Sequence, residues 1–329
     1  MVTGCRLGSK KEVFARSVVL TAGTFIKPLI LRGKKEFSLG PDNKLITTNL
    51  GAQLIKAGFS FLRFKTGTPP RIKADTINFS SLKKINPPSE PLFFSEQSYR
   101  SFRGIFHSLP VYLSRTNFNT HQIVRKNLDS FFVKKELAIG PRYCPSLELK
   151  TVLYPEKEDH QIFLEPETVL GQSIYPQGLS LSLASSVQKA VIRSIVGLEK
   201  AELIRYGFAI QYDAINPKDL NSTLETKLVN NLWLAGQINC TTGYEEAAAQ
   251  GLVAGLNAAR AALGKKQVVL DPKNSYIGFL IDDLVSRPIV EPYRVLTSKS
   301  SERMFLRHDN SSYRLKKMGY HLGLVSLSD

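Results

Sequence analysis

Apolar and polar positions along the chain follow two different periods, so the sequence predicts a mixture of strands and helices. Short apolar runs at 18–25 and 232–235 have the length and residue types of buried strands. The first is predicted to be a parallel strand that ends in a turn of small residues. Alternating residues predict further strands at 59–65 and 160–167. The two threonines and the Pro-Pro pair of residues 66–71 predict a fixed polar loop after the first of these strands. A period near 3.6 residues predicts the helices. These span residues 48–56, 120–128 and 184–196, an alanine-rich stretch from Gly243 or Tyr244 to about Ala262, and parts of the segment after Asp271.

The first residues predict two strands, at 1–8 and 12–20, joined by a Gly-Ser-Lys-Lys turn. A hairpin of this kind usually continues a sheet that begins earlier in a chain. We therefore expect a fragment or truncated gene product in which a glycine-rich first phosphate loop is missing.

The stretch from Leu232 to Gly251 predicts a strand, a sharp turn and then a helix with small residues in its first turns. Free N–H groups at a helix start suit an anionic or electron-rich ligand. This order of elements is typical of a nucleotide cofactor site in a doubly wound sheet. The alternative is a close-packed joint between strand and helix that binds nothing.

Composition limits the number of domains and the class of protein but does not indicate a function. The 329 residues suffice for about two domains. Their formal net charge of +16 favours a polyanionic partner such as RNA, although a genome biased toward lysine codons gives the same charge without binding. No apolar run has the length of a membrane span. Three widely spaced cysteines indicate a reducing compartment, and their spacing gives neither a disulfide framework nor a zinc site.

Four strings of residues together resemble the glucose-inhibited division protein A family. They are Lys65-Thr66-Gly67-Thr68-Pro69-Pro70-Arg71, then 140–150, 160–167 and 236–251. Shorter matches at 281–284, 291–294 and 306–310 extend the similarity almost to the end of the chain. The similarity covers only the middle of the family's protein, because its first flavin-phosphate loop and its C-terminal helical domain are absent here.

The resemblance implies an enzyme that builds the 5-carboxymethylaminomethyl (or aminomethyl) group on the wobble uridine U34 of tRNA. It implies FAD, NADH and methylenetetrahydrofolate as cofactors. It also implies a homodimer and an MnmE-like GTPase partner, with no membrane association. The compartment would be the cytoplasm in a bacterium, and the mitochondrion or a plastid in a eukaryote.

The fold implied is α/β: a partial, doubly wound FAD-binding domain of the glutathione-reductase type with an inserted α/β domain. We expect part of the FAD-binding domain at 1–71, an inserted NAD- or substrate-binding domain at 72–160, and the second part of the FAD-binding domain at 161–265. Residues 266–329 would begin a helical region that binds tRNA or the partner. Residues 84–116 receive no functional account.

The resemblance also implies site residues. Gly236, Gln237 and Ser38 would contact FAD, although the residues around Ser38 depart from the family pattern. Apart from the resemblance, the segment after Asp271 is rich in Arg, Lys and Tyr, so we expect its Arg294, Arg303 and Arg307 to contact RNA. The nicotinamide cofactor would contact Gly140, Pro141, Arg142, Tyr143, Cys144, Pro145, Ser146, Leu147, Glu148, Leu149, Lys150, Thr151, Val152, Leu153 and Tyr154.

Cys144 is the candidate catalytic residue. Attack on C6 of a uracil makes C5 nucleophilic and needs a soft nucleophile, and a thiolate flanked by Arg142 and Lys150 would serve. The alternative is a small buried thiol with a packing role. Leu149 stands where the family pattern has an acid, which removes a carboxylate near Cys144.

Other candidates also keep a second interpretation. Arg142 either pairs with a phosphate or forms an ion pair with Glu148 or a neighbour. Gln237 either contacts the flavin or caps the following helix. Glu245 and Glu246 complement the helix dipole, or less plausibly transfer a proton. Cys240 replaces a family glycine, which is tolerable only where that residue does not need a positive φ.

Two rival functions remain open. One is the related folate- and FAD-dependent tRNA uridine methyltransferase. The other is a truncated, inactive remnant that at most binds tRNA or a subunit, because losing the first phosphate loop should weaken FAD binding severely.

Overall fold

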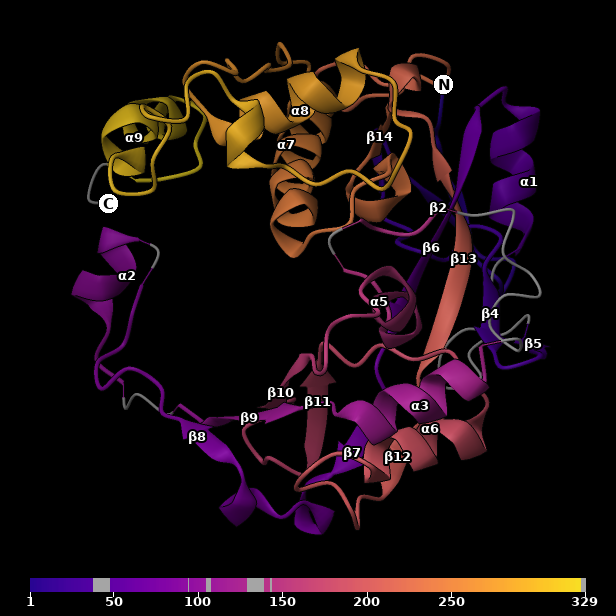
Figure 1. The fold of residues 1–329 in the computed structure, drawn as a ribbon. Coiled ribbons are helices and arrows are strands. Elements are labelled where there is room, and N and C mark those ends of the chain that lie inside the picture. The colour runs from indigo at the N-terminus through magenta and orange to yellow at the C-terminus, as the bar shows by residue number, and fades with distance from the viewer. Residues whose placement is uncertain (38–47, 94, 105–107, 129–138, 143, 327–329) are drawn as a thin grey trace. The chain divides into compact units, whose positions relative to one another are not determined.

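The computed structural model describes residues 1–37, 48–93, 95–104, 108–128, 139–142 and 144–326 (Figure 1). The chain contains both helices and strands and has the fold of solved α/β relatives described below, so the predicted α/β class is confirmed. The chain divides into two compact units. Unit 1 comprises Met1–Lys27, Thr47–Phe64 and Tyr212–Asp329, and unit 2 comprises Pro28–Ile46 and Lys65–Gln211. The four-part domain division predicted from the sequence stays a prediction.

Unit 1 contains short strands and most of the long helices. A parallel pair, β3 with β14, lies against the long helix α7, and the fully buried Trp233 is the largest side chain of the core beneath it. The elements of unit 1 are β1 (Gly4–Arg6), β2 (Glu12–Phe14), β3 (Val18–Leu20), α1 (Thr48–Lys56), β14 (Leu232–Leu234), α7 (Tyr244–Ala262), α8 (Tyr276–Ser286) and α9 (Ser311–His321).

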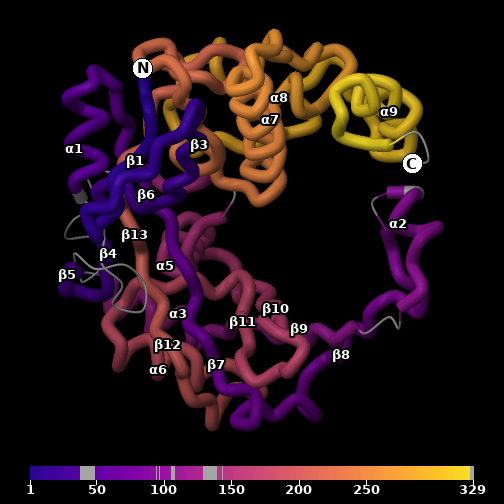
Figure 2. The backbone as a smooth tube through the Cα atoms, turned by 180° about the vertical axis from the view of Figure 1, so that it is seen from behind, coloured from indigo at the N-terminus to yellow at the C-terminus, as the bar shows by residue number. Residues whose placement is uncertain are grey.

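Unit 2 is built on a six-stranded sheet in the order β12-β7-β11-β10-β9-β8. Figure 2 shows β7, β11, β10, β9 and β8 following one another across the unit. Its strands are β7 (Arg71–Lys73), β8 (Lys83–Ile85), β9 (Val111–Arg115), β10 (Gln161–Pro166), β11 (Ser173–Gln177) and β12 (Leu203–Arg205). Its helices are α2 (Glu96–Ser101), α3 (Phe118–Lys126), α5 (Leu147–Leu153) and α6 (Ser185–Arg193).

A four-stranded sheet has the order β5-β4-β13-β6. Its strands β4 (Leu29–Arg32) and β5 (Lys35–Phe37) belong to unit 2. The long strands β6 (Phe61–Thr68) and β13 (Phe208–Ile215) begin in one unit and end in the other. Short 3₁₀ turns complete the fold at Ala74–Thr76, Phe79–Ser81, Pro217–Asp219, Gly236–Asn239 and Thr297–Lys299.

Alternation along β10 decides which face of the six-stranded sheet is buried. Ile162 and Leu164 are fully buried and pack in one apolar core with Val124 of α3, Leu147 of α5 and Val191 of α6. Helices therefore cover this face, and Figure 1 shows α3 and α6 side by side there. Residues at the intervening positions of β10 point to the opposite face.

Three strand predictions need correction. The predicted second strand at 12–20 is two strands, because β2 pairs antiparallel with β1 whereas β3 pairs parallel with β14. The strand predicted in 18–25 is parallel and ends at Leu20 before the small residues, as expected, but it is not fully buried, because Val19 is 36% exposed. The predicted polar loop at 66–71 is mostly strand, since β6 continues to Thr68 and β7 begins at Arg71. β-branched threonine suits a strand, so its polarity alone was a poor indicator of a loop.

Candidate active site

Unit 2 brings together three of the four strings that the sequence singled out. The Lys65 amide donates to the carbonyl of Ile139 at 3.0 Å, which joins β6 to the start of the loop at Gly140. Arg71 Nε pairs with Glu167 Oε1 at 2.5 Å. The first string therefore contacts the second at one end and the third at the other.

A pocket of unit 2 is lined by the first two strings. Residues 65–67 of β6 form one wall, Gly140, Cys144 and Ser146 belong to another, and residues 180–182 complete it. Gly67 permits this approach, because a Cβ at that position would lie 2.6 Å from Ser180 Oγ. Ser146 accepts a hydrogen bond from the Leu149 amide at 3.4 Å and so caps α5 at the edge of the pocket.

Cys144 lies on the lining of this pocket and is exposed. The alternative of a small buried thiol is therefore wrong. Lys150 is half-buried, and its Nζ donates to the carbonyl of Gly178 at 2.8 Å. Burial lowers the pKa of Lys150, and the nearby Cys144 opposes that effect. The hydrogen bond to Gly178 thus fixes the position of the Lys150 ammonium group.

The remaining residues of the predicted nicotinamide segment divide between core and surface. Leu147, Glu148 and Thr151 are buried. Glu148 Oε1 accepts hydrogen bonds from the Ser182 amide at 2.6 Å and from the Ser182 hydroxyl at 3.2 Å, and burial raises the pKa of the Glu148 carboxyl. These contacts give Glu148 the role of holding α5 to residues 181–183.

Other members of this segment are accessible. Arg142 is exposed, Leu149 lines the pocket beside Cys144, and Tyr143 lies outside the described residues. Exposed side chains also follow at Val152, Leu153 and Tyr154.

The fourth string folds in unit 1 as the predicted strand, turn and helix. The Ala235 amide donates to the carbonyl of Leu20 at 3.1 Å, and Gly236 turns the chain with φ +86°. Buried Gln250 of α7 then fixes the turn: its Oε1 accepts from the side-chain amide of Asn239 at 2.9 Å, and its Nε2 donates to Thr241 Oγ1 at 2.9 Å. A rigid polar turn therefore precedes α7.

Gln237 does not cap α7. The N-cap residue is Gly243, where no side chain of the described residues makes a capping hydrogen bond. Gln237 is instead half-buried beside the hydroxyl of Tyr212. Burial is the main cause that raises the pKa of this hydroxyl, and the contact with Gln237 opposes it. The first N–H groups of a helix have no partner within the helix, so the start of α7 offers donors to a ligand. Ser38, the other predicted cofactor residue, lies outside the described residues.

Cys240 corrects the sequence argument about the turn. This residue has φ +69°, the left-handed conformation that favours glycine, and it is fully buried. A cysteine was expected to be tolerable only if this position does not need a positive φ, and the structure shows that it does. The left-handed backbone costs roughly 1–2 kcal/mol. Burial raises the pKa of the Cys240 thiol, and its Sγ donates to the carbonyl of Ile215 at 3.2 Å.

We expect the Cys240→Gly variant to be more stable than Cys240→Ala by about 1 kcal/mol, because only glycine removes the left-handed strain. Both variants lose the buried sulfur, so the comparison isolates the backbone. Urea unfolding of the two proteins measures the difference. Equal stability of both variants would show that the turn relaxes around the cysteine.

Glu246 is a structural anchor rather than only a partner of the helix dipole. Its side chain is 1% exposed, and its Oε1 accepts from Arg294 Nε at 3.0 Å and from the Val295 amide at 2.9 Å. The Tyr293 amide also donates to the carbonyl of Cys240 at 2.8 Å. Residues 293–295 are thereby bound directly to the turn and to the first turn of α7.

The three arginines predicted to contact RNA differ in their surroundings. Arg294 is held by Glu246, and Arg307 pairs with Asp309 at 2.7 Å. Arg303 is exposed. The sequence analysis assigned Arg294 to RNA and did not predict its ion pair with Glu246. The match of Glu291-Pro292-Tyr293-Arg294 to the family pattern was the one signal that this segment has a defined role.

Comparison with known proteins agrees with this arrangement. The profile of the family described as "Glucose inhibited division protein A" matches residues 1–266. The chain belongs to this family. None of the helices in the described part of the chain is long and apolar enough to cross a membrane.

Curated relatives in the family carry the name "tRNA uridine 5-carboxymethylaminomethyl modification enzyme MnmG". The Geobacillus thermodenitrificans protein is 47% identical over 315 residues, which is 95% of this chain and 50% of that protein. The Mycoplasmopsis synoviae protein is 47% identical over 322 residues, or 97% of this chain and 52% of its own length. The chain thus spans about half the length of the curated relatives it matches.

Solved structures of the family have the same fold. Aquifex aeolicus GidA in its form II crystal superposes with a TM-score of 0.90 at 42% identity, covering 99% of this chain and 53% of that one. The form I crystal also gives 0.90, at 43% identity. The identity is high enough to transfer the arrangement of elements.

Proposed function

We propose that the chain is the thiol- and cofactor-bearing part of an FAD-dependent enzyme that forms the 5-carboxymethylaminomethyl or aminomethyl group on U34 of tRNA. NADH would be the reductant, and methylenetetrahydrofolate would supply the one-carbon unit. The names of the relatives support the reaction class. The observation that carries the proposal is the exposed Cys144 on a pocket lined by two of the family's strings.

Cys144 is the nucleophile in this proposal. Its sulfur would add to C6 of the uracil, which moves electron density to C5 and lets C5 form a bond to the methylene carbon carried by the folate. The bond from that carbon to the folate nitrogen would then break, and the nitrogen of the amine donor would take its place. Lys150, whose ammonium is held by the carbonyl of Gly178, would place a positive charge near the reacting sulfur. Loss of the C5 proton and departure of the sulfur would then restore the uracil ring.

The turn of unit 1 fits a flavin nucleotide. The uncapped start of α7 offers N–H donors, Gln237 adds a side-chain amide, and Gly251 and Gly255 have open space beside them on the helix. When bound, FAD would supply the hydride chemistry that the one-carbon unit needs. The chain's own part there is to hold the ligand on a turn that Gln250 keeps rigid.

The proposal extends to the assembly. It includes tRNA as the substrate, a homodimer, and an MnmE-like GTPase as the partner. Exposed Arg303, together with Arg294 and Arg307, would face the RNA. The compartment would be the cytoplasm of a bacterium, or the mitochondrion or plastid of a eukaryote.

Cofactor binding tests the proposal first. We expect the purified 329-residue chain to bind FAD and show the visible bands of oxidised flavin. We expect Gln237→Ala to weaken FAD binding about tenfold, the effect of one lost hydrogen bond. The matched control is Gln53→Ala, which changes an exposed glutamine of α1. A chain that carries no flavin bands after incubation with FAD and removal of the unbound cofactor would favour the inactive remnant. A simple methyl product on tRNA would favour the methyltransferase.

A further inference from the structure

The face of the six-stranded sheet opposite the helices carries a row of side chains that the proposed reaction does not use. In register across the strands, Lys83 of β8 pairs with Leu113 of β9, Leu113 with Phe163 of β10, and Phe163 with Gln177 of β11. Residues paired in this way project from the same face of a sheet. Phe163 lies between the buried Ile162 and Leu164 and so belongs to the face away from the core.

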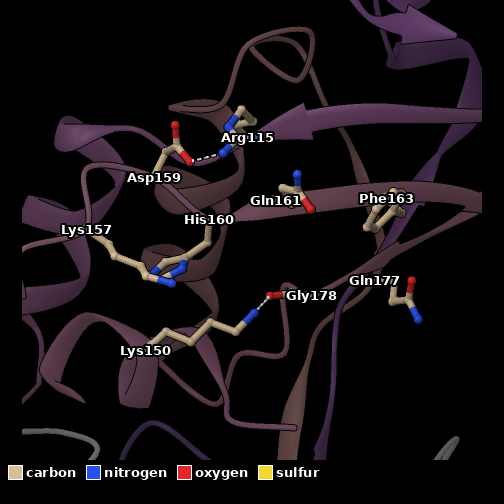
Figure 3. A pocket seen from close by; sticks show the side chains of 9 residues that line it. All are labelled: Arg115, Lys150, Lys157, Asp159, His160, Gln161, Phe163, Gln177 and Gly178. Atoms are coloured by element: carbon tan, nitrogen blue, oxygen red, sulfur yellow. Dashed lines mark hydrogen bonds and ion pairs between the residues drawn. The ribbon is translucent and has the colours of Figure 1, made fainter. Parts of the chain in front are cut away.

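A pocket lies at one end of this row, where the end of β9, the start of β10 and the end of β11 meet (Figure 3). Gln161 and Phe163 line it from β10, Arg115 from β9 and Gln177 from β11. Lys150 of α5 and Lys157, from the turn before β10, line the rest together with Asp159 and His160. All of these residues belong to unit 2.

The pocket is positively charged. Three cations, Arg115, Lys150 and Lys157, line it together with one carboxylate, Asp159, which pairs with Arg115 at 2.6 Å. His160 lies among these groups, and burial, Lys150, His121 and Lys157 lower its pKa to about 4, so it is neutral at pH 7. Two cations therefore remain without a compensating carboxylate among the pocket's described residues.

One buried nitrogen of the pocket lacks a partner. His160 Nε2 is buried and makes no hydrogen bond to any described residue. A buried polar atom without a partner costs free energy unless a ligand or water satisfies it. Together with the excess of positive charge, this atom points to an anionic ligand that can exchange a hydrogen bond.

The other half of the pocket suits a nucleobase. Phe163 offers an aromatic ring, and Gln161 and Gln177 offer amides that both donate and accept hydrogen bonds. Two residues along a strand span about 7 Å, so Phe163 lies about that far from Gln161, which is paired with Arg115. This separation is comparable to the distance between the base and the phosphate of one nucleotide. Aromatic stacking beside a positively charged groove is how proteins bind single-stranded nucleic acid.

We propose that this pocket binds one nucleotide of a single-stranded stretch of RNA. Its phosphate faces Lys150, Lys157 and Arg115, and its base stacks on Phe163. The inference rests on the proposed function, in which tRNA is the substrate. A free dinucleotide offers the same phosphate and base, but two features favour RNA: the row continues from the pocket to Lys83 of β8, and the chain carries a net charge of +16.

Binding of fluorescein-labelled single-stranded dodecauridylate to the full 329-residue chain tests the proposal. Lys157→Ala should weaken binding about fivefold and reduce the salt dependence of log K by about 0.7, the share of one phosphate contact. Phe163→Leu keeps an apolar side chain in place and should weaken binding at least about fivefold through lost stacking. The matched control is Lys189→Ala, which removes one exposed charge from α6 on the other side of the sheet and should change binding less than twofold.

The opposing outcomes are distinct. Equal binding by Lys157→Ala, Phe163→Leu and Lys189→Ala would overturn the proposal, as would an unmodified chain that does not bind the oligonucleotide. Weaker NADH binding in the two pocket variants, with RNA binding unchanged, would assign the pocket to the dinucleotide instead. FAD binding tests the proposed function independently of this pocket. Lys157 and Phe163 lie in unit 2, whereas the turn before α7 that is proposed to hold the flavin belongs to unit 1.

Discussion

We expect Cys144→Ser to lower the rate of uridine modification in tRNA by roughly a thousandfold or more. A hydroxyl in place of the thiol is hardly ionised at neutral pH and is a poor nucleophile toward C6. Cys144 is exposed, so the variant should keep the thermal stability of the unmodified chain. The measurement is mass spectrometry of nucleosides from tRNA incubated with the chain, FAD, NADH, methylenetetrahydrofolate and an amine donor.

Cys5→Ser is the matched control, because Cys5 is also exposed but lies on β1 of unit 1. This variant should modify tRNA at the rate of the unmodified chain. A Cys144→Ser protein that retains a tenth of the activity would show that another group attacks the uracil. Loss of activity in both variants would point to general thiol damage rather than to a specific nucleophile.

We expect Glu246→Ala to lower the free energy of unfolding by about 3 kcal/mol. The variant removes two hydrogen bonds to a buried carboxylate, one from Arg294 Nε and one from the Val295 amide. The Arg294 side chain is 40% exposed and can turn to solvent, which keeps the loss below that of a fully buried pair. Urea unfolding of both proteins gives the difference.

Glu245→Ala provides the control at the neighbouring position, since Glu245 is exposed and should change stability by less than about 0.5 kcal/mol. Equal effects of the two variants would mean that only the helix dipole matters. Gly243→Ala extends the test, because a Cβ at Gly243 would lie 1.5 Å from Glu246 Oε2. It should destabilise the unmodified chain clearly and the Glu246→Ala variant much less.

The sequence sufficed where local signals agreed with each other. The helices predicted at 48–56 and from Gly243 or Tyr244 to Ala262 are α1 and α7, and the strand expected near 232–235 is β14. In each case the apolar period and the flanking glycines pointed to the same element. Two of the strings that identified the family form the turn before α7 and part of the pocket around Cys144.

Local patterns failed where a distant segment decided the outcome. Whether Cys144 is buried depends on residues 65–67 and 180–182, which lie far from it in the sequence. The apolar run at 18–25 contains an exposed Val19, because strand pairing and not composition sets which residues are covered. Glu246 looked like an ordinary acid at a helix start until Arg294 and Val295 were found beside it.

By itself, the sequence determined the α/β class, the strand-turn-helix unit at 232–262 and the family, because these depend on residue types at short spacing. Only the tertiary structure decided that three strings converge in unit 2, that Cys240 is left-handed, and that Phe163 and Lys157 share a pocket. These properties depend on contacts between residues far apart along the chain. No local period encodes such contacts, because they form only once the strands have paired and the cores have closed.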